Sequence, residues 1–291
     1  MIIKAKNVRK QYHKNVALND LNLTLEGNKI IGLLGKNGAG KTTLMRLLAG
    51  HFLKSGGELT INNEAPFNNY AAMKNVCLIM ESNNFHDKFR VKDILNISAN
   101  FYPNWDREYA NHLVNVFRLN KNQKAKTLSK GMYSALGIIV GLASNAPITI
   151  FDEPYIGLDA AFRSTFYDLL LETYQNNPRL IILSTHLIDE VSKLFEEVVI
   201  LHEGTLMLHD TADNLEQKHI ILTGSKEEID QITSGRNIIH DSTMMGQKTV
   251  VLYDENITEA GSLKVSKASL QELFVYLTKE EVNKYVRTNE I

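Results

Sequence analysis

The sequence predicts an α/β protein built on a parallel sheet, together with a smaller second domain. Over the first 215 residues, short apolar runs alternate with helical patterns, which is typical of strands buried between helices. A glycine-rich loop lies between one such strand and the helix beyond it. From 216 to 291 a separate strand–helix–strand pattern follows. We therefore expect an α/β domain over 1–215 and a small α+β accessory domain over 216–291.

The elements of the larger domain follow from its apolar runs. The pattern predicts a buried strand over Lys29–Leu34 and a helix over Thr43–Leu48, one on each side of the glycine-rich loop. A peripheral hairpin is expected around Leu59–Ile61, after a Gly-Gly turn. Further buried strands are expected at Ile148–Phe151, Leu180–Leu183 and Val198–Leu201.

Two other regions have their own patterns. The segment from about 82 to 146 is mostly helical and is interpreted as a helical subdomain inserted between strands, with helices over Asp106–Leu119 and Ser134–Ala143. In the C-terminal region, strands are expected at His219–Thr223 and Lys248–Tyr253, with a helix over Ser225–Ile232 between them. A last helix is expected to begin at Ser269, because a glutamate three residues later completes a capping box.

The composition argues against several classes of protein. The 291 residues include 32 Lys and Arg against 33 Asp and Glu, a formal net charge of −1, which argues against a dedicated nucleic-acid binder. The single cysteine, Cys77, excludes an intramolecular disulfide and a Cys-rich metal site, and it favours a reducing cytosol. The longest apolar run, Ala135 to Ala143, has about half of the roughly 18 to 20 residues that a membrane span needs. We expect this chain not to cross a membrane by itself.

The glycine-rich loop over 35–42 reads G-K-N-G-A-G-K-T and matches the phosphate-binding pattern in full. Its glycines let the backbone curl, so that successive N–H groups and the following helix N-terminus face phosphate oxygens. Lys41 is expected to reach the β and γ phosphates and Thr42 to ligate Mg²⁺. The loop therefore predicts a site for a nucleoside triphosphate. The residues expected to contact it here are Gly35, Asn37, Gly38, Gly40, Lys41, Thr42 and Thr43.

Polar residues end two neighbouring strands. Asp152 and Glu153 end one apolar strand, and His186 ends the next. Ligands of parallel sheets bind at the carboxyl ends of the strands, so Asp152 is placed to hold Mg²⁺ through water and Glu153 to polarise an attacking water. The alternative is structural: one acid caps the next helix and the other pairs with a surface cation, while His186 is an ordinary satisfied group. The phosphate loop favours the catalytic interpretation.

Further motifs complete a family pattern. Leu128–Met132, with the sequence LSKGM, lies about twenty residues before Asp152, and Gly157–Asp159 follows it. With these motifs in this order, the chain resembles an ATP-binding subunit of the ABC transporter family over about 1–215. The resemblance implies that Tyr12 stacks on adenine, because it stands where the family has an aromatic ring. The resemblance implies a P-loop NTPase fold of the ABC ATPase type.

The resemblance also implies how the site works. ATP would be held between two ATPase subunits, which form a homodimer or a heterodimer with a paralogue. Ser129 and Gly131 of one subunit would contact the γ-phosphate bound by the other, and Asp159 would lie in the loop that crosses the interface. Glu153 would be the general base, and His186 would hold the γ-phosphate and the water. A separately encoded membrane permease would anchor the chain at the cytoplasmic face of the membrane, and no nucleic acid would be involved.

Two positions depart from the commonest family sequence. Glu81 takes the place of a glutamine that ligates Mg²⁺, and Lys130 replaces a glycine of the signature. As a hypothesis, these residues make hydrolysis slow and dependent on the partner. The segment Asn83–Leu95 corresponds to the groove that receives a permease helix in the family. Its alternative interpretation is an ordinary mixed surface.

The leading interpretation of function is the ATPase of an exporter. The chain loosely resembles the ATPases of phenol-soluble modulin and peptide exporters, although the permease would select the substrate. One alternative is a soluble ABC-type ATPase acting on a non-membrane partner, as on ribosomes or DNA. Another is a mainly regulatory nucleotide-binding subunit, which the presence of Glu153 and His186 disfavours.

Overall fold

The computed structural model describes residues 1–244, 246–253 and 263–278. It divides the chain into two compact units. Unit 1 comprises Met1–His186 and Leu201–Met207, and unit 2 comprises Leu187–Ile200 and Leu208–Ile291. The units therefore exchange segments between 187 and 207, whereas the sequence pattern placed a single boundary at 215. Within the described ranges, no helix combines the length and hydropathy that a bilayer crossing requires.

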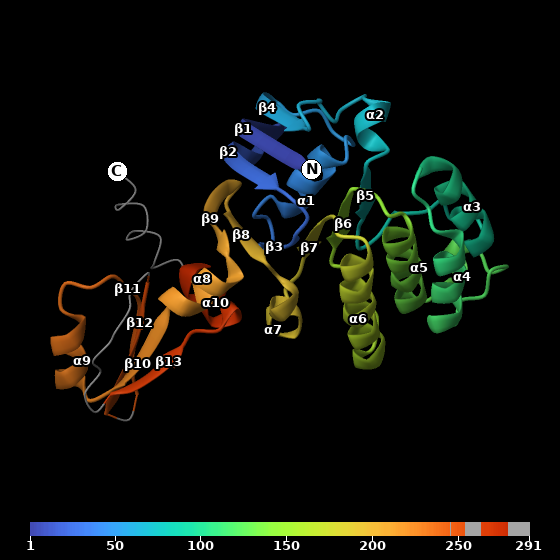
Figure 1. Ribbon diagram of the computed structural model, residues 1–291. Coiled ribbons are helices and arrows are strands. Elements are labelled where there is room, and N and C mark those ends of the chain that lie inside the picture. Colours follow the sequence, from blue (N-terminus) through green and yellow to red (C-terminus); the bar gives the residue numbers. More distant parts are fainter. Residues whose placement is uncertain (245, 254–262, 279–291) are drawn as a thin grey trace. The chain divides into compact units, whose positions relative to one another are not determined.

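Unit 1 is built on parallel strands, as the alternation of apolar runs predicts (Figure 1). The strands β5 (Val76–Ile79), β6 (Ile148–Asp152), β7 (Leu180–Ser184) and β3 (Ile30–Leu34) are neighbours in this order, and each adjacent pair is parallel. Every residue of β3, β6 and β7 is buried, which explains why most of their side chains are apolar. The next strands, β8 (Glu197–His202) and β9 (Thr205–Thr211), contain residues of both units.

An antiparallel sheet forms the N-terminal part of unit 1. Its strands are β2 (Asn15–Glu26), β1 (Ile2–Tyr12) and β4 (Gly56–Ile61), in this order. The sequence analysis missed β1 and β2, although their buried residues largely alternate with exposed ones. The hairpin expected around 59–61 is a strand that pairs with the distant β1, with Ile3 opposite Ile61.

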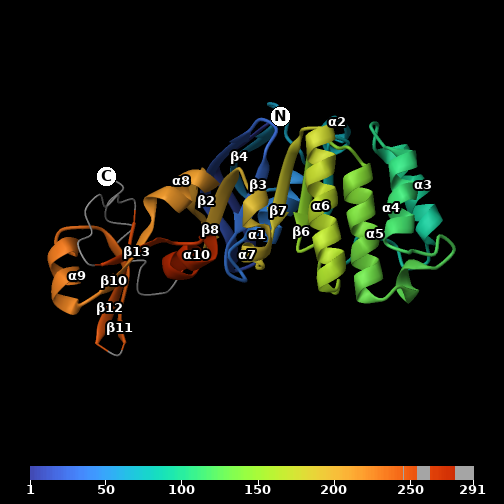
Figure 2. The same cartoon turned by 60° about the horizontal axis from the view of Figure 1, so that its bottom comes forward.

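The helices of unit 1 are α1 (Lys41–Leu48), α2 (Tyr70–Met73), α3 (Val91–Phe101), α4 (Arg107–Val116), α5 (Lys130–Ala143) and α6 (Ala160–Asn176), with a 3₁₀ turn over Ala125–Thr127. Figure 2 shows α6, α5, α4 and α3 side by side. The region 82–146 is mainly helical, as predicted, but α3 and α6 were not predicted. Helix α5 also begins four residues before the expected Ser134, because Ser129 caps its first turn by accepting a hydrogen bond from Met132 N.

Unit 2 has an antiparallel sheet with the strand order β11-β12-β10-β13. Apolar side chains of β10, β12 and α9, including Leu222, Ile229 and Val250, form its own core. Ser225 caps α9 and Ser269 caps α10, as the capping boxes predict. The elements are α7 (Ile188–Val191), a 3₁₀ turn (Ser192–Leu194), α8 (Ala212–Lys218), β10 (Ile220–Gly224), α9 (Lys226–Thr233), β11 (Ile238–Met244), β12 (Gln247–Leu252), β13 (Lys264–Lys267) and α10 (Leu270–Thr278).

Candidate nucleotide-binding site

The phosphate loop joins β3 to α1 and has a backbone that only glycine adopts easily. Gly38 and Gly40 have φ angles of 84° and 101°, in the left-handed region. A Cβ on Gly40 would lie 2.6 Å from the carbonyl oxygen of Ala17, whereas a Cβ on Gly38 would meet nothing within 4 Å. The loop therefore packs tightly against the chain at Gly40 and opens to solvent at Gly38, where a ligand can approach the backbone.

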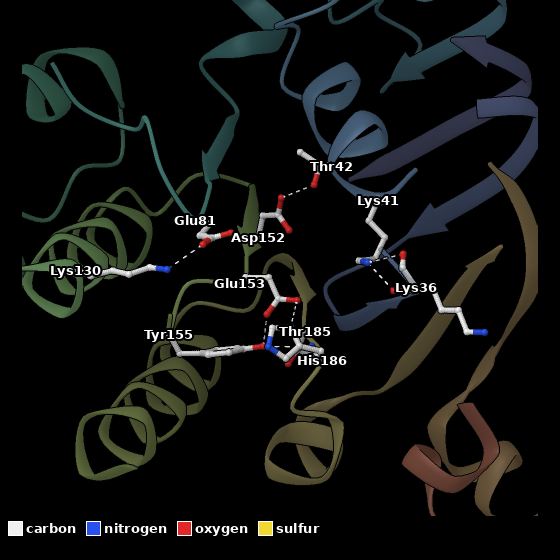
Figure 3. A network of polar contacts seen from close by, with 11 residues as sticks. Lys36, Lys41, Thr42, Glu81, Lys130, Asp152, Glu153, Tyr155, Thr185 and His186 are labelled. Atoms are coloured by element: carbon white, nitrogen blue, oxygen red, sulfur yellow. Dashed lines mark hydrogen bonds and ion pairs between the residues drawn. The ribbon is translucent and has the colours of Figure 1, made fainter. Parts of the chain in front are cut away.

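Lys41 and Thr42 begin α1 beside this loop (Figure 3). The Lys41 ammonium donates to the carbonyl oxygens of Gly35 at 2.6 Å and Lys36 at 3.3 Å. Burial lowers the pKa of Lys41, and the nearby Glu153 and Asp152 carboxylates oppose this shift. A polyphosphate beside the ammonium would also raise the pKa of Lys41, because its negative charge stabilises the charged form of the lysine.

Thr42 and Asp152 come together although 110 residues separate them. Thr42 Oγ1 donates to Asp152 Oδ2 at 2.8 Å, and the Asp152 side chain is buried at the carboxyl end of β6. A hydroxyl and a carboxylate are hard oxygen donors of the kind that Mg²⁺ prefers beside phosphates. These two residues therefore fit a magnesium ion bound between the loop and the strand end.

Glu153 and His186 lie within hydrogen-bond distance, with Nδ1 of the imidazole 2.7 Å from Oε1 of the carboxylate. Glu153 has a φ of 51°, and its N–H donates to the carbonyl oxygen of Ser184, so the strand end turns sharply at the glutamate. The histidine side chain is 64% exposed, while that of the glutamate is only 15% exposed. The histidine is thus free to move from a carboxylate that is held in place.

Tyr155 holds the other oxygen of this carboxylate, and sequence reasoning missed it. Its hydroxyl donates to Glu153 Oε2, lies 2.6 Å from Thr185 Oγ1, and accepts the His186 N–H at 3.2 Å. Burial, followed by the neighbouring Glu153 charge, raises the pKa of Tyr155, so the phenol stays a proton donor at neutral pH. Only its position two residues after Glu153 could have drawn attention to it.

The signature residues lie at the start of α5. Ser129 is the N-cap, and Gly131 packs so closely on the loop before α6 that a Cβ there would lie 2.4 Å from the carbonyl oxygen of Gly157. Asp159 caps α6 by accepting the Phe162 N–H at 2.8 Å. The structure therefore links the two segments that the sequence assigned to a dimer interface, and it gives Asp159 a capping contact within its own chain.

The two unusual residues of the pattern contact each other. Lys130 Nζ lies 3.1 Å from Glu81 Oε1, and both side chains are about half exposed or more. The remaining predicted residue, Tyr12, ends β1 and lies edge to face with Phe52, at a centroid distance of 5.8 Å, beneath the Lys10 ammonium. No described contact joins Tyr12 to the phosphate loop. All the predicted site residues belong to unit 1.

A comparison with protein families agrees with this geometry. The family model described as "ABC transporter" matches residues 18–156, which include the phosphate loop, the LSKGM segment and the strand end at 152–153. Residues 18–156 are therefore similar to the ATP-binding domain of ABC transporters, a family of ATPases. With its parallel sheet and helices, the chain has the fold of an ABC ATPase.

Related proteins and structures extend over more of the chain than the family match. The ABC transporter ATP-binding protein YtrB of Bacillus subtilis (strain 168) is 26% identical over 219 residues, which cover 75% of each chain. The bacitracin transport ATP-binding protein BcrA of Bacillus licheniformis is 27% identical over 296 residues, which cover 95% of this chain and 97% of that protein. A dimeric structure of a bacterial ABC transporter cassette has a TM-score of 0.64 at 22% identity, and covers 72% of this chain and 98% of its own.

Proposed function

We propose that this chain is the ATP-hydrolysing subunit of an exporter whose membrane-spanning permease is a separate chain. The observation that carries the proposal is the convergence of Lys41, Thr42, Asp152, Glu153 and His186 at one edge of the parallel sheet. The similarity to BcrA, a bacitracin transport ATP-binding protein, over nearly its whole length supports a role in transport. The chain then acts at the cytoplasmic face of the membrane through its permease.

The phosphate loop holds the triphosphate of ATP. Its N–H groups and the N-terminus of α1 surround the phosphates, and Lys41 exchanges its two carbonyl partners for phosphate oxygens. Thr42 and Asp152 would hold Mg²⁺, and Glu81 would be a further carboxylate near the ion. When bound, Mg²⁺ neutralises charge on the β and γ phosphates and fixes their geometry.

Glu153 is the general base that takes a proton from the attacking water. Both of its carboxylate oxygens are engaged, Oε2 by Tyr155 and Oε1 by His186. Each oxygen keeps a further lone pair for a water, and a swing of the exposed imidazole toward the γ-phosphate widens the access to Oε1. Tyr155 keeps the carboxylate in position during this change, so the site becomes active when His186 moves from the base to the substrate.

A second ATPase subunit, identical or paralogous, completes the site. Ser129, Gly131 and Lys130 lie at the exposed N-terminus of α5, where a helix end favours the γ-phosphate of ATP bound to the other subunit. The dimeric cassette structure supports this arrangement at the level of the fold. ATP binding closes the two subunits and hydrolysis reopens them, which moves the permease.

The permease docks into an apolar groove of about 220 Å³ between β5, the loop after it and α3. Phe89 and Ile97 line the groove and are 40% and 49% exposed, an unusual amount for such side chains. At its base, the N–H groups of Asn84 and Phe85 donate to the Tyr133 hydroxyl of α5. A helix pressed into the groove therefore acts on both the Glu81 loop and the signature helix.

Turnover of ATP at increasing protein concentration tests this function. We expect the specific rate to rise with concentration, because two subunits form each site, and to fall at least 100-fold in Glu153→Gln. The exposed Glu172→Gln on α6 is the matched control and should retain the wild-type rate. A rate that Glu153→Gln leaves intact would remove Glu153 as the base, and a specific rate that is substantial but independent of concentration would contradict the shared site.

A further inference from the structure

A second pocket lies in the helical region and shares no lining residue with the apolar groove or the phosphate loop. It has a volume of about 140 Å³ and lies between α3, α4 and the turn after α4, two helices that are side by side in both views (Figure 1, Figure 2). Lys92 on α3, Arg107 on α4 and Lys121 in the turn line it, and none of its lining residues is acidic. The proposed ATPase function uses none of these side chains.

The surrounding region is also basic. Between 82 and 146 the sequence has nine Lys and Arg residues against four Asp and Glu, although the whole chain is almost neutral. The nearest acids along the chain are Asp93, Asp106 and Glu108. Asp93 and Asp106 already accept the backbone N–H groups of Arg90 and Tyr109, and Glu108 is exposed in the first turn of α4. The cations of the pocket therefore lie together without a carboxylate among them.

Two asparagines hold the cations in position. Arg107 donates to Asn96 Oδ1 at 3.2 Å, and Lys121 donates to Asn111 Oδ1 at 2.7 Å. Because the amide oxygens accept these bonds, the remaining polar groups of both asparagine side chains are N–H donors. The backbone N–H of Lys92 also donates to the carbonyl oxygen of Lys121, which links α3 to the turn. The pocket thus presents positive charge and donors to a ligand.

We propose that this pocket binds the phosphate group of an anionic ligand. Three cations, one of them a guanidinium that can make paired hydrogen bonds, match the charge and the oxygens of a phosphate. The volume is well below the roughly 300–1,000 Å³ of sites for drug-sized ligands, so it admits one small group and not a whole nucleotide. A soluble phosphate and a phospholipid headgroup share this chemistry.

The fluorescence of Trp105 gives a direct test of ligand binding in this pocket. It lines the pocket and is the single tryptophan of the sequence, so the intrinsic tryptophan fluorescence of the full chain reports on this place alone. One arm titrates glycerol phosphate at constant ionic strength. The other titrates vesicles of phosphatidylcholine with or without phosphatidylglycerol. Both arms are repeated in Lys41→Ala, so that binding at the phosphate loop is recognised by its loss.

We expect a saturable fluorescence change that persists in Lys41→Ala and weakens at least tenfold in Lys92→Gln/Lys121→Gln. The control Lys124→Gln/Lys126→Gln removes the same charge from exposed positions outside the pocket and should keep the wild-type response. If the double variant fails to fold, Arg107→Gln serves the same purpose. A response in the first arm identifies a soluble phosphate, and one restricted to phosphatidylglycerol vesicles identifies a headgroup.

Three results would overturn the proposal. The first is the absence of a fluorescence change in either arm, and the second is an equal weakening in the control and pocket variants. The third is loss of the response in Lys41→Ala. Because the readout does not depend on ATP turnover, it stands or falls separately from the ATPase function.

Discussion

Glu81 and Lys130, the two residues that depart from the commonest family sequence, form an ion pair with each other. In the proposed site, a carboxylate near Mg²⁺ and a lysine in the LSKGM segment would each change the local charge, but the two side chains lie 3.1 Å apart and neutralise one another within the same chain. An ion pair this exposed contributes only about 0–1 kcal/mol to stability. Its effect is therefore expected on the position of the two loops rather than on folding.

Replacing Glu81 tests that effect. We expect Glu81→Gln to raise basal ATP turnover several-fold, because it releases Lys130 and removes a negative charge near the γ-phosphate, while the unfolding temperature stays nearly unchanged. Steady-state turnover with and without the permease is the measurement. Lys130→Gly, which breaks the same pair from the other side, should also raise basal turnover. Unchanged basal and stimulated rates in Glu81→Gln would exclude a role for the pair.

Among the elements, α5 joins the signature to the loop before α6. Gly131 leaves no room for a side chain, since an added Cβ would lie 2.4 Å from the carbonyl oxygen of Gly157. The same helix receives the loop after Glu81 through Tyr133. Helix α5 therefore connects the proposed permease groove with the proposed dimer contact.

We predict that Gly131→Ala lowers ATP turnover more than tenfold, because the Gly157 loop must shift, while nucleotide binding to the phosphate loop changes less than twofold. Equilibrium binding of a fluorescent ATP analogue and steady-state turnover separate the two effects. Gly56→Ala is the matched control, since its added Cβ would meet only an ordinary contact at 3.6 Å. Equal turnover in both variants would contradict the close packing at Gly131.

The groove next to α3 makes a separate prediction. Ile97→Asp should abolish co-purification with the permease, because it places a charge in the apolar surface that the partner covers, and ATP binding by the isolated chain should remain. Leu171→Asp on α6 is the control, since Leu171 is also an exposed apolar residue, at 38%. If Ile97→Asp still co-purifies with the permease, the permease binds a different surface of the chain.

At the scale of the whole molecule, each unit has its own apolar core. In unit 2, Ile229 is fully buried against the sheet strands, and α7 packs against α10, although 82 residues separate Ile188 from Leu270. This packing explains why Leu187–Ile200 belongs with the C-terminal residues. The nucleotide site, in contrast, lies within unit 1.

The two units should therefore respond to different perturbations. We expect Ile229→Ala to destabilise unit 2 by about 2–5 kcal/mol through the cavity it leaves, whereas saturating ATP analogue stabilises unit 1 by about 2.7 kcal/mol at 100 times the Kd. Calorimetry of the full chain should show each effect on a different transition. The exposed Ile2→Ala is the control and should shift neither. A single transition that both treatments move equally would show that the units unfold together.

Individual elements show where local sequence is sufficient. The phosphate loop and the acids at the end of β6 were predicted, because glycine spacing and strand ends are local signals. Helix α3 was missed although Val91, Ile94, Leu95 and Ser98 are buried at helical spacing, since Arg90 occupies the N-cap without the usual Ser, Thr, Asp or Asn. The strands β1 and β2 were missed because bulges interrupt their alternation.

The sequence by itself determined the parallel α/β fold, the phosphate loop and the ABC transporter resemblance, because each depends on residues close together in the chain. Only the tertiary structure decided that Tyr155 holds Glu153, that Lys130 pairs with Glu81, and that Lys92, Arg107 and Lys121 share a pocket. It also decided which segments form each unit. The Lys130–Glu81 pair and the pocket join residues of different elements, and Tyr155 reaches Glu153 through the sharp turn at the strand end, so the pattern along one element predicts none of these contacts.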